Sequence, residues 1–132
     1  MKKKWLPVIS MTLLLLLMAA VSQAAVSKNI SAGEAFQMLQ KDKDVFLLDV
    51  RTAQEYFQMR LDNARLIPIG QFVKRIAEVP KDRPLLVYCA VGSRSSQVAN
   101  YLAKQGYSDV YNMYGGIYAW QGRGYPVLQG PP

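Results

Sequence analysis

The one cysteine of the chain, Cys89, is the residue whose type and position most clearly suggest chemistry. It follows the apolar run 85–88 and precedes a short glycine-containing segment that ends at Arg94. Backbone N–H groups in a loop and in the first turn of a helix lack helical partners, so they can converge on an anion. A helix N-terminus and a nearby arginine also favour the thiolate form of cysteine. The segment therefore predicts a nucleophilic thiolate inside a cradle of backbone amides.

The predicted cradle consists of the residues that follow the cysteine. They are Ala90, Val91, Gly92, Ser93 and Arg94. Gly92 would let the loop close tightly, because glycine accepts positive φ. Such a cradle could hold a second sulfur atom on Cys89, or an oxyanion that attacks or leaves. A lone cysteine at a strand end is also compatible with a small buried apolar residue, and the spacing alone leaves both interpretations open.

The composition excludes several other kinds of site. With one Cys and no His in 132 residues, the sequence holds no intramolecular disulfide, no multi-thiolate zinc site and no His-dependent catalytic triad or dyad. The 16 Lys and Arg residues outnumber the 9 Asp and Glu residues, for a net charge of +7. Three of those lysines lie at the N-terminus and the others are scattered, so we expect no nucleic-acid binding.

The N-terminal segment 1–24 predicts a cleaved export signal. Three lysines at 2–4 precede an unbroken apolar run, and the small residues that a signal peptidase requires lead up to Ala24. We expect cleavage after Ala24, a single domain over residues 25–132 and a periplasmic location. The alternative is an uncleaved membrane anchor, because residues 5–21 reach the lower limit of a spanning helix.

The elements that must position Cys89 begin with two strongly apolar strands. Near-continuous apolar runs at 45–50 and 85–88 predict strands that are buried on both faces. Shorter strands are expected at 64–69 and 109–113. Ligands in parallel sheets bind at the carboxyl ends of the strands, and Cys89 falls at such an end.

Helices are expected between these strands. Capping boxes at Ser31–Glu34 and Thr52–Glu55 predict two helix starts, and further helices are expected at 72–76, at 93–105 and after Gly115-Gly116. This alternation predicts an α/β fold of three layers, with a central parallel sheet and helices on both faces.

Several other residues have expected structural roles. Asp49, at the end of a strand, is expected to pair with Arg51 and to brace the cysteine loop. Glu55 is expected to act as a helix cap. Core packing is the expected role of Tyr114, Ile117 and Trp120.

Three segments, taken together and in order, resemble the rhodanese family of sulfurtransferases over about residues 30–127. The first is Leu48-Asp49-Val50-Arg51 followed by Glu55-Tyr56, the second is Val87-Tyr88-Cys89 with Gly92 and Arg94, and the third is residues 115–120 with Gly124-Tyr125-Pro126. The resemblance implies the rhodanese fold for most of the chain beyond the export signal.

The resemblance also implies roles for individual residues. Cys89 would be the nucleophile that accepts a sulfane sulfur and becomes a persulfide, and the backbone amides of residues 90–94 would cradle that sulfur. Arg94 would close the loop, and Asp49 and Arg51 would lie near the site. Related phosphatases and arsenate reductases have five residues between Cys and Arg, whereas this chain has four, which resembles the sulfurtransferase form.

One position departs from the family pattern. Arg60 stands where the family often has His. From the sequence we interpret Arg60 as a solvated charge at a helix end, and the alternative is a side chain that faces the site and attracts an anionic donor.

The function implied is transfer of a sulfane sulfur from thiosulfate, or a similar donor, to cyanide or a thiol. The expected partners are small sulfur-containing anions or thiols, including a protein thiol, and the cycle needs no metal and no organic cofactor. A non-catalytic or sulfur-carrier binding module is one alternative. A phosphatase or arsenate reductase is another, which the short loop disfavours.

Overall fold

The computed structural model describes residues 1–2 and 26–132. The predicted signal over residues 1–24, beyond its first two residues, and the predicted cut after Ala24 lie outside the described residues. Among the residues that are described, no helix has the length and apolar character needed to cross a membrane.

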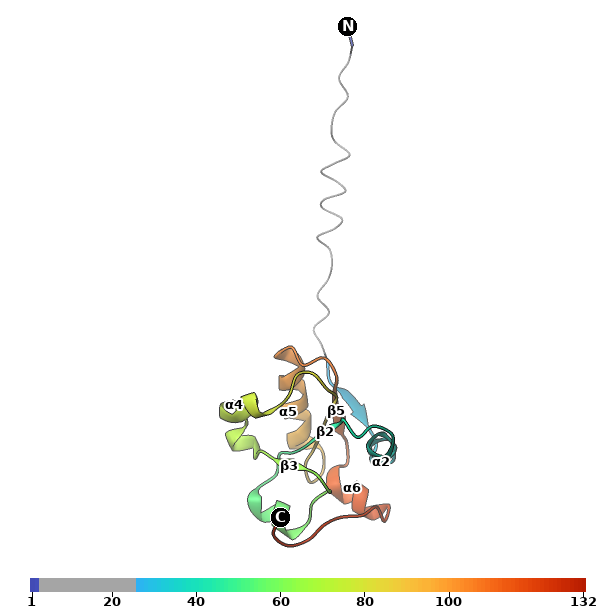
Figure 1. Ribbon diagram of the computed structural model, residues 1–132, viewed down its shortest axis with the longest axis vertical. Coiled ribbons are helices and arrows are strands. Elements are labelled where there is room, and N and C mark those ends of the chain that lie inside the picture. Colours follow the sequence, from blue (N-terminus) through green and yellow to red (C-terminus); the bar gives the residue numbers. More distant parts are fainter. Residues whose placement is uncertain (3–25) are drawn as a thin grey trace.

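Five parallel strands form one sheet in the spatial order β1-β5-β4-β2-β3 (Figure 1). The strands are β1 (Lys28–Ile30), β2 (Phe46–Asp49), β3 (Arg65–Leu66), β4 (Leu85–Tyr88) and β5 (Val110–Met113). This sheet confirms the predicted α/β fold with a central parallel sheet. The local sequence does not predict β1, because its three residues carry only one apolar side chain and form an edge strand beside β5.

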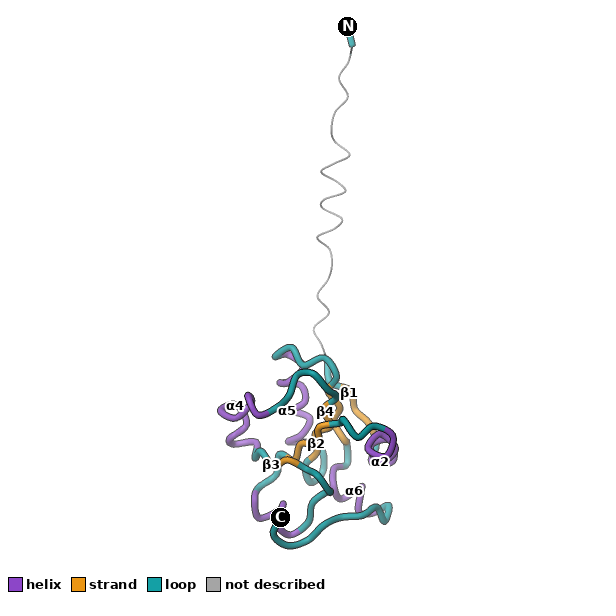
Figure 2. Tube along the Cα trace, in the orientation of Figure 1, coloured by secondary structure: helices purple, strands orange, loops and turns teal. Residues whose placement is uncertain are grey.

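Helices cover both faces of the sheet, as predicted (Figures 1 and 2). They are α2 (Ala32–Lys41), α3 (Ala53–Gln58), α4 (Phe72–Arg75), α5 (Ser93–Lys104) and α6 (Gly116–Gly122), with 3₁₀ turns at Ile69–Gln71 and Ile76–Glu78. Side chains alternate along a strand, so Leu47 of β2 packs with α2 and α6 while Leu48 packs with α4 and α5.

Both predicted capping boxes are present. Ser31 Oγ accepts a hydrogen bond from the Glu34 N–H at 3.1 Å, and Glu34 Oε2 accepts one from the Ser31 N–H at 2.7 Å. Thr52 and Glu55 form the same reciprocal pair at the start of α3. Each pair satisfies two backbone donors that the helix itself leaves free, which explains where α2 and α3 begin.

Of the three core residues predicted after β5, two are buried and one is exposed. Ile117 and Trp120 are buried between α6 and the sheet, as predicted. The prediction for Tyr114 is wrong, because its side chain is 53% exposed. The chain leaves the sheet after Met113 and turns through Gly115 in a left-handed conformation, so Tyr114 lies outside the packed layers.

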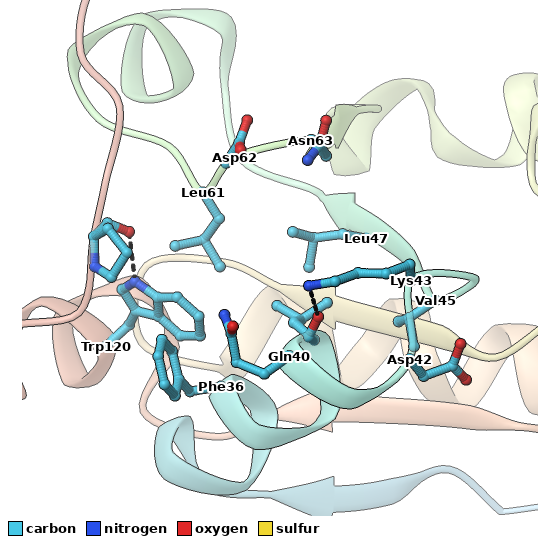
Figure 3. Close-up of a pocket in the computed structure, with 12 residues that line it drawn as sticks. Phe36, Gln40, Asp42, Lys43, Val45, Leu47, Leu61, Asp62, Asn63 and Trp120 are labelled. Atoms are coloured by element: carbon cyan, nitrogen blue, oxygen red, sulfur yellow. Dashed lines mark hydrogen bonds between the residues drawn. The ribbon is translucent and has the colours of Figure 1, made fainter.

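A cavity of about 220 Å³ lies on the α2 and α6 face of the sheet (Figure 3). Leu47, Leu61 and Trp120 contribute apolar surface to it, and Asp62 and Asn63 stand at its edge. None of the predicted site residues lines this cavity.

Candidate active site

The carboxyl ends of β2 and β4 meet at one edge of the sheet. Asp49, the last residue of β2, lies opposite Tyr88, the last residue of β4, and Cys89 follows directly. The structure therefore brings Asp49 and Cys89 to the same end of the sheet, where ligands of parallel sheets bind.

The cysteine loop turns back over its own sulfur. Cys89 is fully buried, the Gly92 N–H donates to its Sγ at 3.1 Å, and the Ser95 hydroxyl reaches the same Sγ at 3.4 Å. Gly92 has φ of +102°, which confirms the predicted need for glycine at the turn. The loop residues thus form a small enclosure whose donors point at the sulfur.

Opposing effects set the ionisation of this thiol. Burial raises the pKa of Cys89, whereas the hydroxyl of Ser95 and the backbone N–H groups of Ser95, Gly92 and Val91 lower it. The hydrogen bonds outweigh burial, so the pKa of Cys89 lies below its ordinary value. This direction agrees with the predicted thiolate.

The start of α6 holds the cysteine loop from behind. The Ile117 N–H donates to the Cys89 carbonyl at 2.9 Å, and the Tyr118 N–H donates to the Ala90 carbonyl at 3.2 Å. Gly116 has φ of +59°, and a Cβ at this position would overlap the Ala90 carbonyl. The predicted tight turn is therefore also a close approach between two backbones. Because α6 binds the carbonyls of Cys89 and Ala90, these carbonyls point away from the sulfur and the N–H groups of the loop are available to it.

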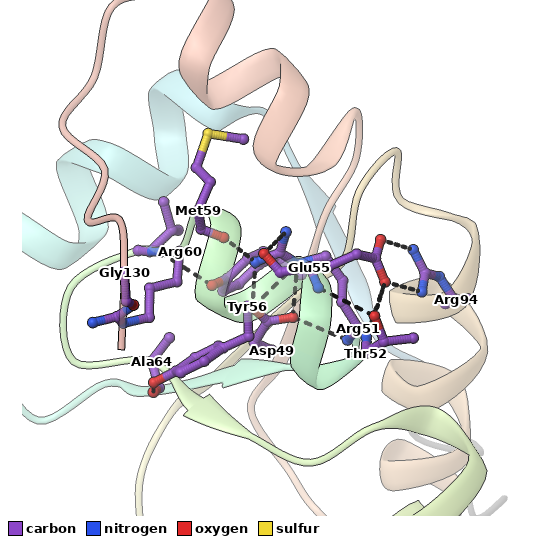
Figure 4. Close-up of polar contacts among 12 residues, drawn as sticks. Asp49, Arg51, Thr52, Glu55, Tyr56, Met59, Arg60, Ala64, Arg94 and Gly130 are labelled. Carbon is purple, nitrogen blue, oxygen red and sulfur yellow. Dashed lines mark hydrogen bonds and ion pairs between the residues drawn. The ribbon is translucent and has the colours of Figure 1, made fainter. Parts of the chain in front are cut away.

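Arg94 closes the loop through an ion pair with α3. Its Nη1 and Nη2 donate to Glu55 Oε2 and Oε1 at 2.9 and 2.8 Å (Figure 4). The hydrogen bonds from Arg94 and Thr52 lower the pKa of Glu55 to about 2, and burial opposes them with a smaller effect. Glu55 raises the pKa of Arg94 most, and the negative charge of the Cys89 thiolate raises it as well, so the expected attraction between Arg94 and the thiolate is present beside the ion pair. Glu55 is both the predicted helix cap and a contact to the loop.

Asp49 and Arg51 form the predicted ion pair, and both side chains are buried. Arg51 Nη2 lies 2.7 Å from Asp49 Oδ2, and Arg51 Nε lies 3.0 Å from Asp49 Oδ1. Arg51 also donates to the Met59 carbonyl at 2.6 Å (Figure 4). Its guanidinium lies over the Tyr88 ring. The hydrogen bond to Met59 fixes the end of α3, and the contact with Tyr88 joins the pair to the residue before Cys89. That the pair braces the cysteine loop stays a prediction.

Arg60 is only 6% exposed, so its interpretation as a solvated charge is wrong. Its backbone pairs with Leu128 in both directions. Its guanidinium donates to the carbonyl of Gly130 (Figure 4) and to that of Pro131. The guanidinium also lies over the Tyr56 ring. The C-terminal segment folds back across α3 and accepts these hydrogen bonds from the Arg60 guanidinium. The sequence around Arg60 does not reveal this contact, because the partners lie some 70 residues away.

Residues 31–123 match the family model for the rhodanese-like domain. The chain belongs to the rhodanese family. A sulfurtransferase of Allochromatium vinosum is 41% identical over 92 residues, which cover 70% of this chain and 86% of that protein. The thiosulfate sulfurtransferase GlpE of Coxiella burnetii is 33% identical over 94 residues, which cover 71% of this chain and 87% of that protein.

The solved structures agree on the fold. A rhodanese-related protein of Thermoplasma volcanium is 30% identical and superposes with a TM-score of 0.70, covering 76% of this chain and 97% of that one. The relatives named as sulfurtransferases support sulfur transfer as the general activity of this rhodanese, and sulfur-containing substrates with it.

Ser95 is the site residue of this rhodanese that the sequence analysis missed. Its side chain is fully buried on the first turn of α5 and touches both the Cys89 sulfur and the Gly92 carbonyl. The signal that could have revealed it is spacing, because a hydroxyl just inside the helix points back toward the loop that precedes it. Within residues 26–132, no group of three or more His, Cys, Asp or Glu side chains is placed to hold a metal ion.

Proposed function

We propose that this rhodanese transfers a sulfane sulfur from thiosulfate to a thiophilic acceptor through a persulfide on Cys89. The observation that carries the proposal is the buried Cys89 sulfur, which faces the Gly92 N–H and the Ser95 hydroxyl. These donors stabilise negative charge on sulfur, first in the thiolate and then in the persulfide, and they need no reorganisation during the reaction. The relative named as a thiosulfate sulfurtransferase supports thiosulfate as the donor.

In the first step, the Cys89 thiolate attacks the outer sulfur of thiosulfate. A bond forms between Sγ and that sulfur, the sulfur–sulfur bond of thiosulfate breaks, and sulfite leaves with the electron pair. The product is a persulfide on Cys89, whose negative outer sulfur stays within reach of the loop amides. Charge is conserved in this step, so no outside oxidant is required.

In the second step, a nucleophilic acceptor such as cyanide or a thiolate attacks the outer sulfur. The bond from Sγ to that sulfur breaks, and the electron pair returns to Cys89 as thiolate. Cyanide gives thiocyanate, and a thiolate gives a new persulfide. The hydrogen bonds from Gly92 and Ser95 then stabilise the leaving thiolate.

We also propose a periplasmic location after cleavage at Ala24. The support is the sequence alone, namely the lysines at 2–4, the apolar run that follows and the small residues before Ala25.

Mass spectrometry of the wild type and of Cys89→Ser tests these proposals. The full sequence is expressed in a Gram-negative bacterium, the protein is purified, and intact mass is recorded before and after thiosulfate. Cyanide is then added and thiocyanate is followed. We expect the gain of one sulfur atom on the wild type only, lost on adding cyanide as thiocyanate forms.

The outcomes separate the proposals. No sulfur gain and no thiocyanate would refute the thiosulfate cycle and favour a protein-borne donor or a binding module. Sulfur gain on Cys89→Ser would show that the nucleophile is not Cys89. A starting mass that corresponds to residues 25–132 in the periplasmic fraction supports the cut after Ala24, and an unprocessed mass in the membrane fraction supports an anchor.

A further inference from the structure

The proposed sulfur transfer makes no use of the cavity on the α2 and α6 face of the sheet (Figure 3). Its volume is about 220 Å³, and the buried side chains of Leu47, Leu61 and Trp120 form its apolar walls. An engineered apolar cavity of about 150 Å³ is large enough to bind benzene. This cavity is therefore large enough for one ring with a short chain, and its walls are in place before a ligand binds.

Two polar side chains from the end of α2 point into this cavity. Figure 3 shows the Gln40 amide and the Lys43 ammonium directed toward the space below Leu61 and Leu47. Lys43 Nζ donates to the Leu39 carbonyl at 2.9 Å, its one hydrogen bond within residues 26–132. An ammonium group has three N–H donors, so Lys43 keeps two donors for a ligand inside the cavity.

Lys43 is also the charged group that faces the cavity. Asp42 points away from the cavity in Figure 3, and Asp62 stands at its edge. In the part of the chain that the structure describes, the ion pairs are made by arginines and none includes Lys43. A lysine with free donors next to apolar walls complements a ligand that joins a carboxylate to an apolar group.

The cavity lies on the opposite face of the sheet from the reactive cysteine. Cys89 packs with core residues on the α4 and α5 side, whereas the walls of the cavity belong to the core on the α2 and α6 side. None of the residues 89–94 lines the cavity. A ligand can therefore occupy the cavity without entering the space around the Cys89 sulfur, and such binding is independent of the proposed sulfur transfer.

From this arrangement we propose that the cavity binds a small organic acid that carries one apolar ring and one carboxylate. The ring packs against Trp120, Leu47 and Leu61, and its removal from water supplies most of the driving force for binding. The carboxylate accepts hydrogen bonds from the Lys43 ammonium and the Gln40 amide, which fix the direction of the ligand. Binding is reversible, and no covalent bond changes.

Phenylacetate and two matched probes test the proposal on the protein expressed from its full sequence. Phenethylamine has the same ring with a positive charge, and acetate has the carboxylate without the ring. The Trp120 indole N–H donates to the Pro126 carbonyl at the cavity wall, and its nuclear magnetic resonance signal, assigned with Trp120→Phe, reports binding. We expect phenylacetate to bind about ten-fold more tightly than phenethylamine, and acetate at about ten-fold higher concentration to leave it bound.

Substitutions then assign the binding to Lys43. Lys43→Met keeps a stem of similar length but removes the ammonium, so the Kd for phenylacetate should rise about ten-fold. Lys41→Met is the matched control, because it removes the same charge from the last residue of α2, which does not line the cavity. The control should keep the wild-type Kd, and circular dichroism should show that both variants are folded.

The outcomes separate this site from the cysteine loop. A Trp120 signal that does not shift with phenylacetate, equal binding of both ring probes, or an unchanged Kd in Lys43→Met would overturn the proposal. Displacement of phenylacetate by thiosulfate, or loss of its binding in Cys89→Ser, would place the acid at the cysteine loop and would also overturn it. A protein that binds phenylacetate in the cavity but takes up no sulfur would refute the proposed function alone.

Discussion

Ser95 and Gly92 supply the side-chain and backbone donors nearest to the Cys89 sulfur. The Ser95 hydroxyl has one proton and two acceptors, the sulfur at 3.4 Å and the Gly92 carbonyl at 3.2 Å. A negative sulfur attracts that proton more strongly than a neutral carbonyl does, so ionisation of Cys89 favours the hydrogen bond to sulfur. The effect is to couple the position of one hydroxyl proton to the charge on the nucleophile.

Ser95→Ala should slow persulfide formation. Loss of the hydroxyl removes a hydrogen bond that lowers the pKa of Cys89, so a smaller fraction is thiolate near neutral pH. We expect persulfide formation to be about ten-fold slower at neutral pH, and the pH at which its rate rises to be higher than in the wild type. Stopped-flow measurement of sulfite release between acidic and alkaline pH provides the profile.

Ser96→Ala is the matched control, because Ser96 is the next residue of α5 and its side chain makes no hydrogen bond in the described part of the chain. It should keep both the rate and the pH profile. If Ser95→Ala leaves the pH profile where it is, the hydroxyl does not act on the ionisation of Cys89.

Glu55 joins the cap of α3 to the cysteine loop, and its acid titration should be visible in stability. The pKa of Glu55 is about 2 in the folded protein, below the value near 4.3 of an unfolded chain. A lowered folded pKa means that the stabilisation is complete above the unfolded pKa and is lost as pH falls through the folded pKa. Glu55→Gln should therefore reduce the melting temperature at neutral pH and flatten its fall between about pH 4 and pH 2.

Glu34→Gln serves as the comparison, because Glu34 caps α2 in the same way but pairs with no arginine within residues 26–132. Glu34→Gln should change the pH dependence of the melting temperature less than Glu55→Gln does. Equal pH dependence in the wild type and in Glu55→Gln, followed by circular dichroism, would contradict a stabilising role for the pair with Arg94.

The helices and strands are held in place both by contacts between residues close in the sequence and by contacts between residues far apart in it. Local signals predicted the two capping boxes, the strands β2 and β4, and Gly92 at the turn. The pair of Glu55 with Arg94 joins residues 39 positions apart, and the bond from Arg60 to Gly130 spans 70 positions. Neither contact has a local pattern, so the sequence predicts only a helix cap for Glu55 and a solvated charge for Arg60. β1 was missed because its support comes from β5 and not from its own residues.

Gly116→Ala should displace the cysteine loop. The added Cβ would overlap the Ala90 carbonyl, and φ of +59° is strained for a residue other than glycine. We expect the free energy of unfolding to fall by about 2–4 kcal/mol, together with a marked loss of persulfide formation. Urea unfolding and intact mass after thiosulfate measure the two effects.

Gly70→Ala is the control for this change, because a Cβ at Gly70 has no neighbour within 4 Å and its φ is not positive. It should leave stability and sulfur uptake close to wild type. If Gly116→Ala binds sulfur at the wild-type rate, the close approach of α6 to the loop has no part in the chemistry.

In the whole molecule, Arg60 ties the C-terminal segment to α3. Arg60→Met keeps much of the volume but removes the donors to Gly130 and Pro131. We expect the free energy of unfolding to fall by about 1–3 kcal/mol, and limited proteolysis to cut sooner after Val127. Lys74→Met on α4 is the control, and unchanged proteolysis in Arg60→Met would show that the segment is held by other contacts.

The hydrogen bonds of Ile117 and Tyr118 to the cysteine loop also set an order in time. A ribosome makes the chain from its N-terminus, so Cys89 and the whole of α5 are synthesised before the residues that anchor the loop. A nascent chain that stops short of Gly116 carries the thiol without the backbone donors that hold its carbonyls. The thiol therefore gains its finished surroundings only after α6 has been made, and incomplete chains should be poor sulfur acceptors.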